Sequence, residues 1–349
     1  MNVRYTIEYE KDLKRIAGVI TGIEKLRNCR IFVSGAGGLI CSALVDFLMN
    51  LNEWKNAGIE VYAAGRSEAR IRKRFSRWSG RPEFHYLPYD AMERIASEEQ
   101  FDYFIHGASN ANPAAYVREP VETMLANLIG IRNVLEYARG QGSGRVLYLS
   151  SSEVYGKKTT PERYREDEYG FLDILNPRAC YPSSKRASET LCAAFLQEYG
   201  VDSVIVRPGH VYGPTATSSD NRASTQFPRD VLQGRDILMK SPGTQLRSYC
   251  YVLDCVSAMV TVLLNGQAGS AYNISNPNCV VTIRQMAEAF AKAGGRNVVF
   301  DNPTDAERKG YNLMDNSALD SDRLEALGWK GLFDLEAGVR ATLDAMDLT

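Results

Sequence analysis

Residues 30–51 read RIFVSGAGGLICSALVDFLMNL, and this stretch decides the fold. The run Arg30–Ser34 has the composition of a buried strand, and it passes through a glycine-rich turn into an apolar helix that extends to about Leu51. Glycines in this context let backbone N–H groups approach a pyrophosphate at the helix N-terminus, where the helix dipole favours negative charge. The sequence therefore predicts a dinucleotide-binding turn, with contacts from Gly35, Gly37, Gly38, Leu39 and Ile40.

The end of the second expected strand, Glu60–Ala64, indicates which dinucleotide is preferred. An acid normally stands here and accepts hydrogen bonds from the adenosine ribose, but this chain has Gly65 followed by Arg66. A guanidinium in place of a carboxylate suits a 2′-phosphate, so NADP is slightly favoured over NAD. Asp90, just after the third strand, is a candidate for the adenine amino group. Cys41 replaces the third glycine of the usual spacing, and its small side chain fits close helix–strand packing.

Alternation of strands and helices continues beyond this turn. Apolar strands separated by helices of a dozen or more residues are typical of a parallel sheet covered on both faces, which predicts an α/β fold of the Rossmann type, doubly wound. The expected strands are Arg30–Ser34, Glu60–Ala64, Phe84–Leu87, Tyr103–His106, Arg145–Ser150 and Ser203–Arg207. The expected helices include Pro120–Arg139, Tyr181–Tyr199, Gln226–Gln233 and Ile283–Ala293.

The pattern loosens beyond Pro214, which divides the chain into regions. Residues 1–28 are expected to form a helical arm that packs against the protein or a dimer edge and has no chemistry. Residues 29–213 form the predicted Rossmann domain, which binds NAD(P), with a returning segment near 244–265. Residues 214–243 and 266–349 form a smaller C-terminal substrate-binding lobe.

Composition excludes several functional classes. The 349 residues carry a formal net charge of −1, which does not favour nucleic acid or an anionic membrane as a partner. No apolar run approaches the roughly 20 residues of a membrane span, and the charged N-terminus lacks the apolar stretch of a signal peptide. The seven cysteines include no CxxC pair and the three histidines are scattered, so we expect no metal site, and reduced thiols in a cytoplasmic protein.

The segment NPRACYPSSKR, residues 176–186, places Tyr181 and Lys185 four residues apart at the start of a helix. Residues at this spacing share one helical face. A free tyrosine has a pKa near ~10, and a nearby ammonium is expected to lower it. The pair therefore predicts a proton acceptor for a hydroxyl that loses hydride.

A polar strand end upstream supports this hypothesis. Strand 145–150 runs into Ser151, Ser152 and Glu153, at the edge where open α/β sheets bind their ligands. Ser151 is the expected hydrogen-bond partner of the reacting hydroxyl. Glu153 is expected to act as a general base or to orient the substrate.

Together these motifs resemble the extended short-chain dehydrogenase/reductase family, which comprises NAD(P)-dependent epimerases and dehydratases of nucleotide sugars. The resemblance covers roughly residues 29–345. Its other motifs are HGAS at 106–109, NLIG at 127–130, SSEVYG at 151–156, RPGHVYGP at 207–214 and LGW at 327–329. It implies oxidation of a sugar C4 hydroxyl to a transient ketone. It also implies that Ala108, Pro208 and His210 line the cofactor and that Lys185 bridges the nicotinamide ribose.

Within the family, this chain is most like UDP-glucuronate decarboxylases. The likeness lies in PRACY at 177–181, in the Lys-Arg pair at 185–186 and in ETLC at 189–192. In dTDP-glucose 4,6-dehydratases an Asp, which protonates the leaving hydroxyl, stands at the position of Ser152. The resemblance implies substrate contacts from Ser152, Arg178, His210 and Arg247. Two departures bear on substrate and cofactor: Pro182 begins a Pro-Ser-Ser run where an acidic pair is usual, and His210 replaces Asn.

The ketone makes several outcomes accessible, so alternatives stay open. They are a 4,6-dehydratase, a 4-epimerase, and, because of Arg66, an NADPH-consuming reductase of a nucleotide-linked sugar. A non-catalytic dinucleotide-binding regulator is a remote alternative, which the intact Tyr181 and Lys185 oppose. The expected ligand is a nucleotide-diphosphate sugar. By resemblance, a homodimer forms through the outward faces of helices around 116–139 and 181–199.

Overall fold

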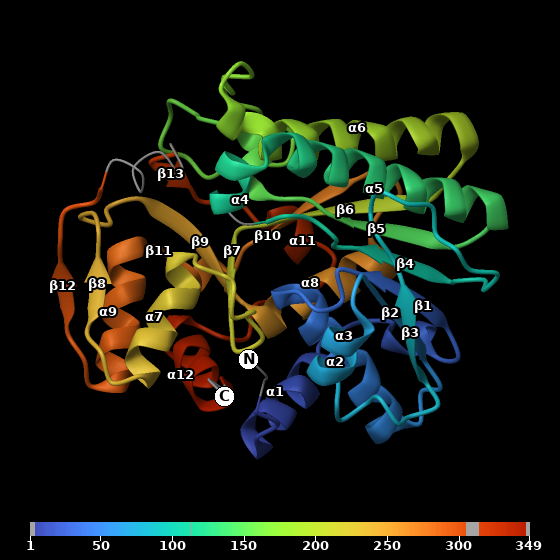
Figure 1. Cartoon of the computed structure of the whole chain (residues 1–349), viewed down its shortest axis with the longest axis horizontal. Helices are drawn as coiled ribbons and strands as arrows, with labels where there is room; N and C mark the ends of the chain where they lie inside the picture. Colours follow the sequence, from blue (N-terminus) through green and yellow to red (C-terminus); the bar gives the residue numbers. More distant parts are fainter. Residues whose placement is uncertain (1–3, 112, 305–313, 347–349) are drawn as a thin grey trace.

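The computed structural model describes residues 4–111, 113–304 and 314–346. Its central feature is a seven-stranded parallel sheet in the order β10-β6-β5-β4-β1-β2-β3 (Figure 1). The chain starts in the middle at β1, builds outward to β3, then crosses to β4 on the other side, which is the doubly wound topology expected from the sequence. The strands are β1 (Arg30–Ser34), β2 (Glu60–Gly65), β3 (Phe84–Pro88), β4 (Tyr103–His106), β5 (Arg145–Leu149), β6 (Ser203–Pro208) and β10 (Ala271–Ile274).

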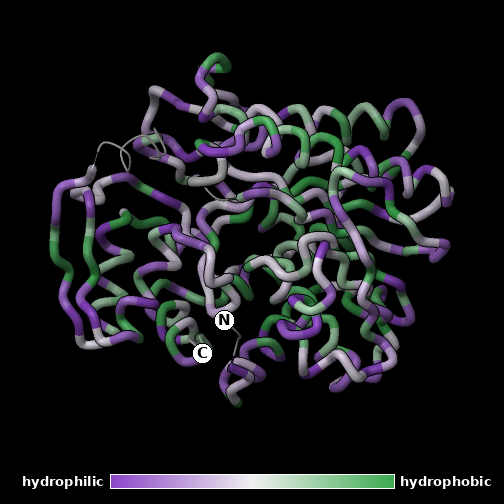
Figure 2. The backbone as a smooth tube through the Cα atoms, viewed as in Figure 1, coloured by the Kyte–Doolittle hydropathy of each residue, from purple (hydrophilic) through white to green (hydrophobic). Residues whose placement is uncertain are grey.

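Helices cover both faces of this sheet. α5 (Pro120–Gln141) and α6 (Cys180–Tyr199) lie side by side over one face, and α2 (Leu39–Lys55) and α8 (Val252–Asn265) cover the other (Figure 1). Alternate side chains of a strand point to opposite faces, so Ile31 and Val33 pack with α2 and α8 whereas Phe32 packs with α5 and α6. Figure 2 shows hydrophobic residues along these central strands and mostly hydrophilic outer loops.

Two segments differ from the predicted regions. β10 extends the main sheet beside β6, although residues 266–349 are expected in the smaller lobe. The segment near 244–265 contributes α8 to the main sheet's cover, but its strand β9 (Leu246–Tyr251) pairs outside that sheet. The sequence signal was weak because β10 has only four residues and β9 is followed by its helix without a turn.

A second group of elements surrounds β9. β9 pairs with β7 (His210–Tyr212), β11 (Val280–Thr282) and β13 (Asn316–Ser317), and a two-stranded sheet joins β8 (Ile237–Met239) to β12 (Val298–Phe300). The helices of this group are α7 (Ala223–Leu232), α9 (Ile283–Gly294) and α12 (Leu335–Ala345), whereas α11 (Asp322–Glu325) packs against β10 of the main sheet. Because β7 follows β6 after one residue, the chain passes from the main sheet into this group at the sheet's carboxyl edge.

The N-terminal arm forms a helix, α1 (Ile7–Ala17), and a separate 3-10 helix, Ile23–Leu26, so only part of the segment 1–28 is helical. Its buried Tyr9 lies against Asp46, which forms a 2.6 Å ion pair with Arg74 and accepts a hydrogen bond from Trp78. The arm is therefore anchored to the nucleotide half of the protein. Within the described residues, no helix is both long enough and apolar enough to cross a bilayer.

Candidate active site

The glycine-rich turn is shaped by close backbone packing. Gly35 has φ +66°, and a Cβ on it would lie 2.8 Å from the backbone of Gly107 and Ala108, so only glycine fits. Gly38 is the N-cap residue of α2, whose first N–H groups therefore face the turn. A Cβ on Gly107 would collide with Cys41 Sγ, so the thiol fills the space beside that glycine. The turn and helix N-terminus fit a dinucleotide pyrophosphate.

The other residues expected at the cofactor follow the carboxyl ends of neighbouring strands. Ala108, after β4, donates its N–H to Ser34 Oγ at 3.3 Å. Arg66, after β2, is exposed, and Asp90, after β3, accepts a hydrogen bond from Met92 N at 2.9 Å. Pro208 ends β6. All therefore lie along the edge where the glycine-rich turn ends β1.

Lys185 is buried at this edge. Its Nζ donates to Leu149 O at 2.7 Å and lies 5.7 Å from the centre of the Tyr181 ring. Burial lowers the pKa of Lys185 to about 7, although the Glu189 carboxylate opposes this shift. The ammonium is thus tied to the end of β5 and lies over the Tyr181 ring.

The pKa of Tyr181 differs from the sequence-based expectation. Burial, followed by the charge of Glu153, raises it to about 12, whereas Ser151 and Arg222 lower it. Lys185 was expected to lower this pKa, but the net shift is upward. That expectation was wrong because burial outweighs a cation that is itself largely desolvated. In the free protein Tyr181 is therefore a neutral phenol at pH 7.

The strand end after β5 turns into a short 3-10 helix, Ser152–Tyr155. Ser151 caps it by accepting a hydrogen bond from Glu153 N at 3.2 Å, and Ser152 is buried. The Glu153 carboxylate accepts two hydrogen bonds from Arg178, at 3.0 and 3.2 Å. The two side chains thus form one bidentate pair close to Tyr181.

Two residues near Tyr181 were missed by the sequence analysis. Tyr116, in α4 (Pro113–Arg118), is buried with its ring stacked on that of Tyr181. Arg222, held by Asp220 at 2.5 Å, lowers the pKa of both Tyr181 and His210 and so lies near both. Neither belongs to a motif, and both come from segments remote in sequence, so spacing could not reveal them.

His210 and Arg247 bring the second group of elements to the site. Burial, then Arg247 and Arg222, lowers the pKa of His210 to about 3, so its imidazole is neutral. Its buried Nδ1 has no hydrogen-bond partner among the described residues. Arg247 is also buried and donates to Leu246 O at 2.9 Å. Two guanidiniums beside an unpartnered imidazole suit an anionic ligand.

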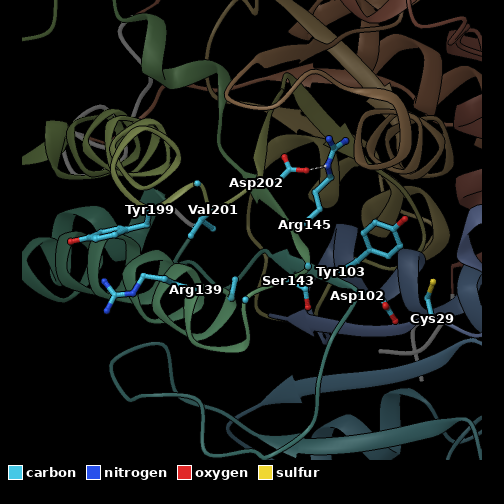
Figure 3. Close-up of a pocket in the computed structure, with 13 residues that line it drawn as sticks. Cys29, Asp102, Tyr103, Arg139, Ser143, Arg145, Tyr199, Val201 and Asp202 are labelled. Atoms are coloured by element: carbon cyan, nitrogen blue, oxygen red, sulfur yellow. Dashed lines mark hydrogen bonds and ion pairs between the residues drawn. The ribbon is translucent and has the colours of Figure 1, made fainter.

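A separate hollow of about 570 Å³ lies at the opposite edge of the sheet (Figure 3). It is lined by residues at the amino ends of the strands, including Asp102, Tyr103 and Arg145. Arg145 is occupied by an ion pair with Asp202 at 2.7 Å. This hollow therefore belongs to the edge away from the turn and Tyr181.

Comparisons with known proteins identify a matching family and named relatives. The sequence model described as "NAD dependent epimerase/dehydratase family" matches residues 31–275. The chain is 32% identical over 319 residues to UDP-glucuronic acid decarboxylase 3 of Arabidopsis thaliana, covering 89% of this chain and 87% of that protein. It is 30% identical over 319 residues to UDP-glucuronic acid decarboxylase 1 of Xenopus tropicalis, covering 90% and 71%.

Solved structures share the fold. A UDP-glucose 4-epimerase of Thermotoga maritima, crystallised with UDP-glucose, superposes with a TM-score of 0.75 at 23% identity and covers 90% of this chain and 97% of that one. A dTDP-glucose 4,6-dehydratase of Bacillus anthracis, in complex with NAD, gives 0.75 at 18% identity and covers 90% and 96%. Each superposition covers 90% of this chain, so it includes both the main sheet and the elements around β9.

Proposed function

The chain belongs to the NAD-dependent epimerase/dehydratase family, an enzyme family acting on nucleotide sugars, and from that premise we propose that it decarboxylates a nucleotide-linked uronic acid such as UDP-glucuronate. The main support for this proposal comes from residues 151–153, which follow β5. Buried Ser152 stands where dTDP-glucose 4,6-dehydratases carry the Asp that protonates a leaving hydroxyl, so that acid is missing here. The named decarboxylases support the same conclusion.

In the proposed reaction Tyr181 takes the proton of the sugar C4 hydroxyl while Ser151 holds the oxygen. A bound nicotinamide dinucleotide would supply the hydride acceptor. The resulting C4 ketone makes the C6 carboxylate a β-keto acid, so carbon dioxide leaves and C5 takes up a proton. Return of the hydride, and of the Tyr181 proton, restores the C4 hydroxyl. Glu153 and Arg178 face this centre as a pair, and we assign them to orienting the sugar.

The substrate diphosphate is assigned to the second group of elements. Arg247 supplies the positive charge, Arg222 stands nearby in its ion pair with Asp220, and His210 offers its unpartnered Nδ1. This arrangement supports the division of the chain into a nucleotide-binding domain and a substrate-binding lobe. It also gives His210 a substrate role beside its expected contact with the cofactor.

The test of the proposed function is turnover of UDP-glucuronate by the purified protein without added cofactor. We expect carbon dioxide release and a UDP-pentose, with UDP-glucose as the control substrate that releases none. Mass spectrometry separates the alternatives. Net gain of hydrogen with consumption of NADPH would establish a reductase, loss of water a dehydratase, and an unchanged mass an epimerase.

Arg66 supports a finer proposal, that the protein prefers NADP over NAD. Replacing Arg66 with Ala removes an exposed cation at the end of β2, where no acid is present to reject a phosphate. We expect the Kd for NADP to rise about tenfold, the equivalent of about 1.4 kcal/mol, with the Kd for NAD nearly unchanged. Fluorescence of the reduced cofactors measures both constants.

A matched control for that variant is Arg72→Ala, which removes an exposed cation that is already paired with Glu68 at 2.7 Å. It should change neither Kd by more than about twofold. An equal loss of affinity for both cofactors in Arg66→Ala would contradict the assignment, since only NADP carries the 2′-phosphate.

We also propose a homodimer through α5. Its N-terminal half exposes Val121, Met124, Leu125 and Leu128, between 39% and 61% accessible, as one apolar stripe. Such a contiguous apolar surface favours a protein contact. A monomer in sedimentation equilibrium at micromolar concentration would oppose this proposal.

A further inference from the structure

Tyr116 lies directly on the ring of Tyr181. The two ring centroids are 4.5 Å apart and the ring planes differ by 15°. Both side chains are buried, and with Cys180 they form a small cluster of their own. Stacking of this kind fixes the plane of each ring, because rotation of either would require the other to move.

Arg178 also lies over the Tyr116 ring. Its guanidinium carbon is 4.7 Å from the Tyr116 ring centroid. Because Arg178 is fixed by its two hydrogen bonds to Glu153, the order of contacts runs from Glu153 through Arg178 and Tyr116 to Tyr181.

We propose that Tyr116 is a positioning residue that holds Tyr181 in the orientation needed for proton transfer and links it to the Glu153–Arg178 pair. This inference rests on the proposed function only in taking Tyr181 as the proton acceptor. Tyr116 itself need not touch the substrate. Its ring restrains the phenol by stacking on it.

The charges around Tyr181 indicate how Tyr116 also acts through its hydroxyl. The groups that face the Tyr181 phenol are Glu153, Ser151, Arg222, Tyr116 and, across the ring, Lys185. The Tyr116 hydroxyl lowers the pKa of Tyr181, whereas burial and the charges of Tyr181 and Glu153 raise the pKa of Tyr116 itself. Tyr116 thus stays protonated and serves as a donor.

Two substitutions separate the ring from the hydroxyl. Tyr116→Phe keeps the stack and loses the donor. We expect the acidic limb of the kcat profile for hydride transfer to move to higher pH by about half a unit to one unit, with KM within about twofold. Tyr116→Ala loses the stack, and we expect kcat to fall by about 10- to 100-fold because the phenol is no longer oriented. Absorbance of the reduced nicotinamide reports this step whatever the final product.

A second measurement needs no substrate. With ¹³C-labelled tyrosine, the ring resonances of Tyr181 are assigned by their loss in Tyr181→Phe. We expect slow ring flipping in the wild-type protein and in Tyr116→Phe, and fast flipping in Tyr116→Ala. Tyr199→Phe, at the exposed end of α6, is the control and should alter neither readout.

The outcomes separate this inference from the proposed function. Fast flipping in the wild-type protein, or unchanged flipping in Tyr116→Ala, would overturn it even if no sugar is oxidised. The positioning role would also be overturned if Tyr116→Phe kept the wild-type pH profile and Tyr116→Ala kept the wild-type kcat. That result would not affect the proposal that the protein is a decarboxylase. A change in KM alone would make Tyr116 a substrate contact and also reject the positioning role.

Discussion

Tyr181→Phe is expected to lower kcat by about 10²- to 10⁴-fold, because it removes the group assigned to take the C4 hydroxyl proton. The ring, its stack on Tyr116 and its burial are retained. Burial, then Glu153, raises the pKa of Tyr181 to about 12, so only a small fraction is ionised at neutral pH in the free protein. The wild-type rate should therefore rise with pH until the pKa of the bound state is passed, and this rise should be absent from the variant.

Cofactor content provides the control for this prediction. Tyr181→Phe should retain as much bound nicotinamide nucleotide as the wild type, because the turn at Gly35–Gly38 is untouched. Loss of both activity and nucleotide would point to a folding defect. Near wild-type activity with a full complement of cofactor would refute the assignment of Tyr181 as proton acceptor.

The sequence predicted the components of this site better than its electrostatics. The Tyr181–Lys185 pair is predictable from the sequence because residues four apart on a helix lie on the same face. The pKa of Tyr181 is not predictable in this way, because it depends on burial and on charges brought by Glu153 and Arg222 from other segments. Tyr116 is a case of the same kind, because its stack on Tyr181 joins positions 65 residues apart in the sequence.

Most strands of the main sheet could be predicted from the sequence, but β10 could not. Long helices follow three of the first six strands, α2 after β1, α5 after β4 and α6 after β5, and the apolar composition of the strands reflects burial on both faces. β10 has no such context, since it follows α8 by a short turn and reaches β6 only through tertiary packing. Short strands whose pairing is decided by distant neighbours lack a local signal.

Glu189 and Arg207 form a buried ion pair beneath the site. Arg207 Nη2 lies 2.6 Å from Glu189 Oε2, and Ser150 Oγ donates to the same carboxylate at 2.5 Å. Arg207 also donates to Tyr155 Oη at 2.9 Å. Burial lowers the pKa of Arg207, but Glu189 and Tyr155 together raise it above its usual value, so the guanidinium stays charged. The pair ties α6, which carries Tyr181 and Lys185, to β6 and to the end of β5.

Glu189→Gln is expected to reduce the free energy of unfolding by about 3–5 kcal/mol, because it leaves the Arg207 charge buried without its partner. Denaturant unfolding followed by circular dichroism measures this change. The control is Glu288→Gln, which breaks an exposed pair with Arg284 at 2.8 Å and should have an effect below about 1 kcal/mol. Equal, small effects in the two variants would show that the buried pair does not stabilise the fold.

A double variant distinguishes loss of charge balance from loss of packing. If the penalty in Glu189→Gln comes from the unpaired guanidinium, then adding Arg207→Met should recover part of the lost stability, since removing both charges of a buried pair is often nearly neutral. Activity should not recover, because the Glu189 charge also opposes the lowering of the Lys185 pKa by burial. Without that carboxylate, the pKa of Lys185 falls further, and less ammonium remains to hold the nicotinamide ribose, the role that the family resemblance implies for Lys185. Stability and kcat should therefore separate in the double variant, whereas a purely structural pair would restore both together.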